Sequence, residues 1–184
     1  MKTLLLLAAL GLLAASSAAA QDSYPKIEVF AGYSFLNTGL TFNRANAHGW
    51  GLSLTRNVDK HVGLTLDLAG QYGTEHISFF LLPGAPSTAG RQGFRNHQLL
   101  LGPTFYKRSG SVTFFAHQLF GPSRFHSRSA TNFTIGTGGG VDLTVRNNIA
   151  VRAFQVDYLP THTSAGWAHD VRIQAGVVFR FGKR

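Results

Sequence analysis

Bulky apolar residues alternate with small or polar residues through most of the chain, which is the period-two pattern of a β-strand with two different faces. The last such segment has Val171, Ile173, Ala175, Val177, Phe179 and Phe181 on one parity and Asp170, Arg172, Gln174, Gly176 and Arg180 on the other. Similar segments begin near residues 26, 49, 62, 98, 133 and 149. Residues 112–120 are apolar on both parities, so we predict a strand there without assigning its faces. The pattern therefore predicts eight strands.

The connections between these strands differ in length in a regular way. Short polar turns at residues 57–60, 107–110 and 146–148 alternate with longer connections at residues 37–47, 73–95, 121–132 and 159–169. An outer-membrane barrel has this arrangement, because its periplasmic turns are short and its extracellular loops are longer. Strands of about 9 to 11 residues are long enough to cross a bilayer. We therefore predict an all-β fold, an eight-stranded antiparallel up-and-down transmembrane β-barrel.

A soluble barrel, such as a lipocalin-like carrier, has the same alternation with its bulky face turned inward. An eight-stranded barrel has an interior only wide enough for side chains or one small ligand. The face opposite the bulky one is mostly Gly, Ser, Thr and Ala, and only 14% of the chain is charged. Such a face suits a narrow polar lumen better than a surface in water, which normally carries more charge. The bulky face is therefore predicted to contact lipid.

Aromatic residues support this placement. Near the predicted outer ends of strands lie Tyr33, Phe35, Trp50, Tyr72, Phe133 and Tyr158, and near the periplasmic ends lie Phe105, Phe179 and Phe181. Two aromatic belts are typical of the two membrane interfaces.

The N-terminus has the composition of a secretory signal peptide. Lys2 precedes an apolar run at residues 4–15, and Ala18 to Ala20 form a small-residue cleavage site. The run is shorter than the roughly 20 residues that span a bilayer as a helix. We predict a signal peptide at residues 1–20 and a barrel domain at residues 21–184, exported to the bacterial outer membrane. The chain has no cysteine, so neither disulfides nor a lipidated cysteine are expected.

Charges on the polar parity are predicted to face the lumen. Asp142 and Arg152 are equally far from the turn at Asn147, so they face each other across a hairpin. Closure of the barrel brings Glu28 close to Arg180, and Asp67 and Arg172 are further lumen candidates. A buried charge without a partner is strongly unfavourable, so paired charges would plug the interior. The alternative is an open lumen in which water solvates these groups.

The polar parity changes within one strand. Arg152 has the same parity as Phe154 and Val156, whereas Gln155 and Asp157 have the opposite one. We predict a β-bulge near Ala153, because a bulge inserts one residue and restores the alternation. Loss of regular pairing at the outer end is the alternative.

The predicted outer loops carry five arginines: Arg44, Arg91, Arg95, Arg124 and Arg128. Arginine makes bidentate contacts with phosphate, so lipopolysaccharide phosphates and acidic sugars are candidate partners. Plain solvation of these charges is the alternative. The net charge is +9, but an exported barrel does not meet the chromosome, so nucleic acid is not a predicted partner.

Six histidines lie near the same loops: His48, His76, His97, His126, His162 and His169. Their spacing matches no recognised metal site, so we predict neither a metal nor a cofactor. The apolar residues 77–82 are expected to be buried under neighbouring loops, although they could instead extend a hairpin or contact a partner.

Four features together resemble OmpA-like outer-membrane β-barrels of the eight-stranded, porin-like group. They are the signal peptide, Gly-Gly-Gly-Val-Asp at residues 138–142, Arg-Ala-Phe-Gln-Val-Asp-Tyr at residues 152–158, and Val-Val-Phe-Arg-Phe at residues 177–181. The resemblance implies insertion by the outer-membrane assembly machinery, which reads a C-terminal strand ending in an aromatic residue. Here Gly182, Lys183 and Arg184 follow Phe181, which departs from that pattern.

Three functions remain in view. We expect a non-enzymatic barrel with a structural, adhesive or surface-binding role and a lumen plugged by charged pairs. The first alternative is a narrow pore for ions or small solutes, and the second is a lipid A-modifying barrel enzyme. His162 and Ser164 resemble a fragment of the lipid A deacylase pattern. A nucleophilic serine needs a base and an orienting group, and no acidic partner is identifiable, so an enzyme is not predicted.

Overall fold

A computed structural model describes residues 24–39, 45–79, 88–125, 130–164 and 166–183. The predicted signal peptide lies outside these residues, and its cleavage stays a prediction. The strands are β1 (Pro25–Thr38), β2 (Ala45–Asn57), β3 (Val62–Phe79), β4 (Thr88–Ser109), β5 (Val112–Phe125), β6 (Ala130–Arg146), β7 (Ile149–Thr163) and β8 (Gly166–Lys183). Among the described residues there is no helix of the length and apolarity needed to cross a membrane.

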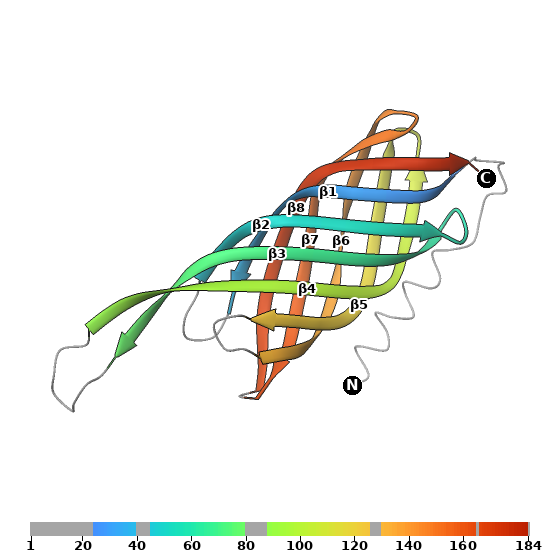
Figure 1. Ribbon diagram of the computed structural model, residues 1–184. Coiled ribbons are helices and arrows are strands. Elements are labelled where there is room, and N and C mark those ends of the chain that lie inside the picture. The colour runs from blue at the N-terminus through green and yellow to red at the C-terminus, as the bar shows by residue number, and fades with distance from the viewer. Residues whose placement is uncertain (1–23, 40–44, 80–87, 126–129, 165, 184) are drawn as a thin grey trace.

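The eight strands form a closed antiparallel barrel in which each strand pairs with its neighbours in sequence and β8 pairs with β1 (Figure 1). The predicted eight-stranded fold is therefore confirmed. Closure leaves no unpaired edge strand, so the ladders satisfy the backbone groups, as a spanning structure in lipid requires. The β3–β4 hairpin reaches farthest beyond the barrel, at the end opposite the short turns (Figure 1).

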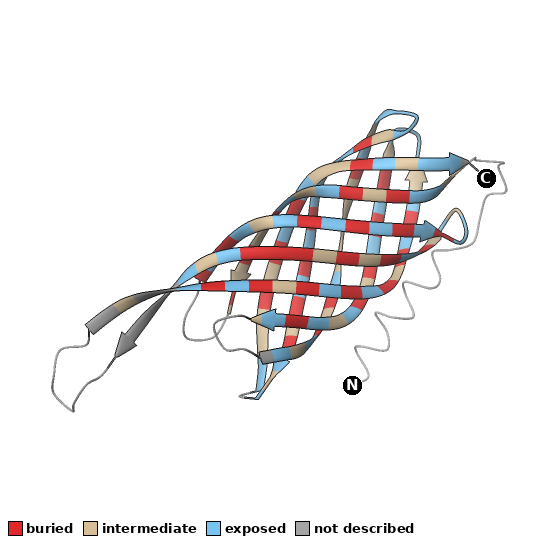
Figure 2. Cartoon of the chain, viewed as in Figure 1, coloured by how far each residue is buried: buried red, intermediate tan, exposed pale blue. Residues whose placement is uncertain are grey.

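The period-two alternation places one set of side chains inside the barrel and the other set on its outer surface. Buried and exposed residues accordingly alternate along the strands in Figure 2. The exposed set includes Trp50, Leu54, Leu101 and Phe179. The faces of β5, which the sequence left unassigned, are settled by pairing with β4 and β6. In β5 the inward residues are Thr113, Phe115, His117 and Leu119.

Two apolar clusters lie inside the barrel beside its polar groups. Toward the outer end the cluster consists of Leu36, Ala45, Ala47, Phe94, Leu100, Leu119 and Leu159. Toward the periplasmic end it consists of Phe30, Ala150 and Val178. The inward parity was predicted to be small or polar, so these apolar residues are an addition that the alternation did not reveal.

The strands run farther outward than predicted. Residues 73–95 were predicted as a long loop, but β3 continues to Phe79 and β4 begins at Thr88, with Ile77 paired to Gly90. Strands β5 to β8 also extend into the predicted loops at residues 121–132 and 159–169. The reason is that ladder hydrogen bonds need no apolar alternation once the strand has left the bilayer. Residues 77–79 therefore extend a hairpin, and residues 80–82 lie outside the described residues.

The predicted bulge at Ala153 is confirmed. Val141 pairs with Phe154, but the next residue, Asp142, pairs with Arg152, so Ala153 has no partner on β6. The register with β8 shifts at the same place, between Arg152 and Gln155. The extra residue keeps Arg152, Gln155 and Asp157 all inside the barrel.

Candidate functional site

The centre of the lumen is occupied by the side chain of Arg172 on β8, which is 0% exposed. Its Nη1 donates to Asp67 Oδ1 on β3 at 2.7 Å and to Gln98 Oε1 on β4 at 3.2 Å. Its Nε donates to Asp157 Oδ2 on β7 at 2.9 Å. One guanidinium thus connects β8 to three other strands, two of them across the lumen.

Asp157 extends the network toward β5 and β6. Its Oδ1 lies 2.8 Å from His117 Nε2, and its Oδ2 accepts a hydrogen bond of 2.8 Å from Gln155 Nε2. Arg152 Nη1 donates to Gln155 Oε1 at 2.6 Å, and Arg152 Nε donates to Asp142 Oδ1 at 2.8 Å. Polar contacts therefore run without interruption from Asp67 to Asp142.

The guanidinium of Arg152 also lies between two aromatic rings. Its carbon is 4.5 Å from the ring centroid of Phe30 and 4.1 Å from that of Phe115. Cation–π contacts of this kind gain strength when the charge is removed from water. Aromatic rings therefore close the space around the polar network on its periplasmic side.

Glu28 forms a second cluster near the periplasmic end, and here the predicted partner is not the nearest one. Arg180 is opposite Glu28 in the β1–β8 register, but its Nε lies 3.9 Å from Glu28 Oε1. Arg108 Nη2, from β4, donates to the same oxygen at 2.9 Å, and Asn57 Nδ2 donates to it at 3.2 Å. The main counter-ion thus comes from across the lumen, because a narrow barrel places non-adjacent strands within side-chain reach.

Sequence reasoning did not place Arg108 and His117 in this interior. His117 lies on the strand whose faces could not be assigned, so no signal placed it inside. The parity change at Ala153 did point Gln155 and Asp157 inward, but their partners come from other strands.

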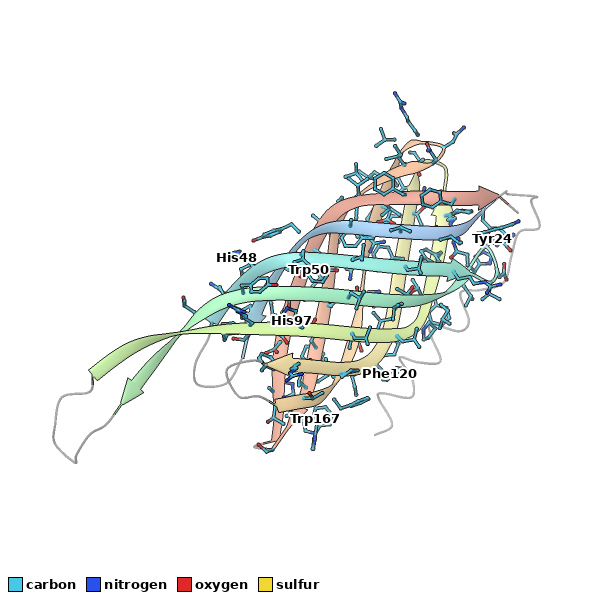
Figure 3. All side chains as sticks on the ribbon, viewed as in Figure 1. Tyr24, His48, Trp50, His97, Phe120 and Trp167 are labelled. Carbon is cyan, nitrogen blue, oxygen red and sulfur yellow. The ribbon has the colours of Figure 1, made fainter. Side chains whose placement is uncertain are left out.

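A different set of polar residues faces outward near the outer end of the barrel. Tyrosine and histidine meet across neighbouring strands: Tyr33 Oη bonds His48 Nδ1, Tyr72 Oη is 3.4 Å from His97 Nε2, and Tyr158 Oη is 2.5 Å from His169 Nδ1. The rings of His162 and Trp167 make an edge contact with centroids 5.1 Å apart. Figure 3 shows His48 toward the end of the barrel opposite Tyr24, with Trp50 and His97 between them. This outward set has the polar-tipped aromatic composition of a membrane interface.

The arginines predicted on outer loops divide into three groups. Arg95 on β4 and Arg124 on β5 are exposed and have the outward parity of their strands. The backbone of Arg91 pairs with His76 in the β3–β4 hairpin, but its side chain is not described. Arg44 and Arg128 lie outside the described residues.

The described residues contain no group of three side chains arranged to hold a metal ion. Of the six histidines, His126 and the side chain of His76 are outside the description.

A family model described as "Outer membrane protein beta-barrel domain" matches residues 5–181. No curated protein sequence matches the chain. Among solved structures, Neisserial surface protein A is similar, with a TM-score of 0.62 and 13% identity, over 88% of this chain and 100% of that one. Ail, the attachment invasion locus protein of Yersinia pestis, solved with the heparin analogue sucrose octasulfate, has a TM-score of 0.51 and 13% identity, over 85% of this chain and 99% of that one.

Proposed function

The chain belongs to the outer membrane protein beta-barrel family, and on that premise we propose that it is a small surface protein with a plugged lumen and a structural, adhesive or surface-binding role. The family places it in the bacterial outer membrane. We further propose that it arrives there by export, with cleavage after Ala20, and is inserted by the outer-membrane assembly machinery. Mass spectrometry of the mature protein tests the cleavage, because its N-terminus should be Gln21.

The observation that carries the plugged lumen is the continuous polar network that runs from Asp67 to Asp142 through Arg172, Asp157, Gln155 and Arg152. Apolar clusters pack beside it inside the barrel. An ion passing through would have to separate buried ion pairs, and breaking such a pair is costly because it leaves an uncompensated charge. A filled interior of this kind supports a role carried by the outer end and not by transport.

The surface-binding role is supported by the shape and charge of the outer end. The β3–β4 hairpin extends beyond the barrel, and Arg95 and Arg124 are exposed there. Ail was solved with a polysulfated sugar. We propose that anionic sugars and lipopolysaccharide phosphates are the partners of this end. Retention of the folded protein on a sulfated polysaccharide, lost as salt rises, is the expected result, and no retention even at low salt would contradict it.

Single-channel recording in planar bilayers tests the plugged lumen. We expect no large steady conductance from the wild type and a measurable one from the double variant Arg152→Ser, Arg172→Ser. Arg56→Ser, on an exposed outward position of β2, is the matched control and should resemble the wild type. Slower migration of boiled than unheated samples on a gel verifies that each variant is folded. A large wild-type conductance would favour the narrow-pore alternative instead.

We also propose that the protein is not an enzyme. Lipid A from cells with and without the protein should have the same acyl composition by mass spectrometry. A protein-dependent gain or loss of an acyl chain would establish the lipid A-modifying alternative.

A further inference from the structure

We propose that Arg95, His97 and Arg124 form a binding site on the lipid-facing wall for the phosphorylated sugar headgroup of an outer-leaflet lipid. The inference rests on the proposed surface-binding role and names its site. The exposed Arg95 and Arg124 that support that role are here assigned to a site on the side of the barrel and not at the tips of its loops.

The strand registers bring these residues together in two neighbouring rows on the outer wall. One row runs from Trp50 on β2 through Gly70 on β3 and His97 on β4 to Arg124 on β5. The next row toward the outer end of the barrel consists of His48 on β2, Tyr72 on β3 and Arg95 on β4. Arg95 and Arg124 are diagonal neighbours, so their Cα atoms are about 7–8 Å apart.

The rows lie where the apolar wall ends. On β4 the outward residues next toward the periplasm are Leu99 and Leu101, both exposed, and on β5 an exposed Phe120 precedes Pro122 and Arg124. Tyr72 lies directly opposite Arg95, and Trp50 is in the same row as Arg124, and aromatic residues of these two types sit at the headgroup level of a membrane. The two guanidinium groups are therefore at the depth of lipid phosphates.

In the described part of the chain, the outer wall offers these two cations no carboxylate counter-ion. Among carboxylates whose side chains the structure describes, the strand residues Glu28, Asp67, Asp142, Asp157 and Asp170 are buried in the lumen, and Asp59 lies in the β2–β3 turn. Neither Arg95 nor Arg124 forms an ion pair within the described residues, where the salt bridges all involve inward-facing groups. Two neighbouring cations next to hydrocarbon favour an external anion, because charge interactions strengthen as the dielectric constant falls.

The chemistry of the rows fits a phosphate attached to a sugar. A guanidinium group presents paired N–H donors that match phosphate oxygens. The indole of Trp50 lies over Gly70, since a Cβ atom at that position would be 2.8 Å from Trp50 Nε1. The row thus places a flat aromatic surface over β3, on the same stretch of wall as the cations of β4 and β5. A sugar ring can lie against the indole while its phosphate contacts the arginines.

Binding of purified lipid A to the folded protein in detergent, measured by native mass spectrometry, tests the site. The probes are bisphosphorylated lipid A and the same lipid with both phosphates removed. We expect the wild type to prefer the phosphorylated lipid by at least about tenfold, since hydrogen bonds to charged groups are the stronger kind. The double variant Arg95→Gln, Arg124→Gln should lose this preference, and Arg56→Gln, an outward arginine at the periplasmic end, should keep it.

Three results would overturn the proposal. One is equal lipid binding by the double variant and the wild type, and another is an equal loss in Arg56→Gln. The third is full competition by equimolar inorganic phosphate, which would indicate a general anion site and not a lipid site. Retention of the same variants on sulfated polysaccharide separates the two proposals. If the polysaccharide is bound but lipid A is not, the lipid site is wrong while surface binding stands.

Discussion

The arginines at the centre of the lumen and those on the outer wall have the same side chain, but the first are buried among polar groups and the second are exposed. Arg172 is fully buried and reaches carboxylates on β3 and β7. Arg124 is exposed, faces outward and lies opposite His97 and Thr131. Among the described side chains, the strand carboxylates therefore lie inside, where they neutralise buried cations, whereas cations on the wall are exposed.

The two arginines show that strand parity, and not residue type, decides whether an arginine of this barrel is buried with carboxylates or exposed on the outer wall. A charge in the lumen must be compensated by the protein itself, whereas a charge at the headgroup level finds its counter-ion in the membrane or in solution. The two sets should consequently differ in what they contribute to stability and to binding.

Deleting one residue within a regular strand should have the largest effect on folding, because it exchanges the inward and outward faces of part of that strand. Removing Ala31 from the regular strand β1 shifts one half of the strand by a residue and turns Tyr33 and Phe35 inward. We expect no folded barrel, measured by the loss of heat-modifiable migration on a gel.

Deletion of Ala153 is the matched control. Ala153 is the unpaired residue of the bulge, so its removal leaves Arg152, Gln155 and Asp157 on the lumen face. This variant should fold. Equal folding of the two deletions would show that parity does not separate the lumen from the wall.

Removing the central cation should have the next largest effect. Arg172→Met leaves Asp67 and Asp157 buried without their main partner and should lower the free energy of unfolding by about 3–5 kcal/mol. Arg124→Met should change it by less than about 0.5 kcal/mol, since it is an exposed surface position. Urea unfolding in phospholipid vesicles measures both.

The triple variant Arg172→Met, Asp67→Asn, Asp157→Asn serves as the rescue. It removes the uncompensated charges, so much of the lost stability should return. Similar losses for Arg172→Met and Arg124→Met would contradict the distinction between the two sets.

The two arginines near Glu28 provide a finer test within the lumen. Arg108→Gln removes the 2.9 Å contact to Glu28 and should cost roughly 1–3 kcal/mol in unfolding free energy. Arg180→Gln removes a 3.9 Å contact to Glu28 and a hydrogen bond to Thr144, and should cost about 1 kcal/mol. The same urea titration compares them, and the reverse order would favour Arg180 as the main partner of Glu28.

The smallest effect is expected on the outer wall. Gly70→Ala places a Cβ atom against the indole of Trp50, which can move because it is exposed, so the cost should stay below about 1 kcal/mol. The chain has two tryptophans, so a Trp167→Phe background isolates Trp50. A shift in its emission maximum is expected, and unchanged emission would show that the indole does not lie over Gly70.

The sequence alone determined the number of strands, the two faces of every strand except β5, and the bulge at Ala153. It also placed Asp142 opposite Arg152, because both residues belong to one hairpin whose turn sets the register. These features are local: lipid on one side and a narrow lumen on the other impose a period of two on every strand, and that period can be read without knowing the neighbours.

Tertiary structure alone decided the contacts across the lumen. His117 meets Asp157 and Arg108 meets Glu28 because closure and strand tilt bring residues of non-adjacent strands to the same depth. The neighbours Arg95 and Arg124 differ from these, because they belong to the single β4–β5 hairpin, whose register brings them together. The period-two pattern does not reveal the depth of a side chain along the barrel axis, because that depth depends on how all eight strands are staggered around the closed barrel.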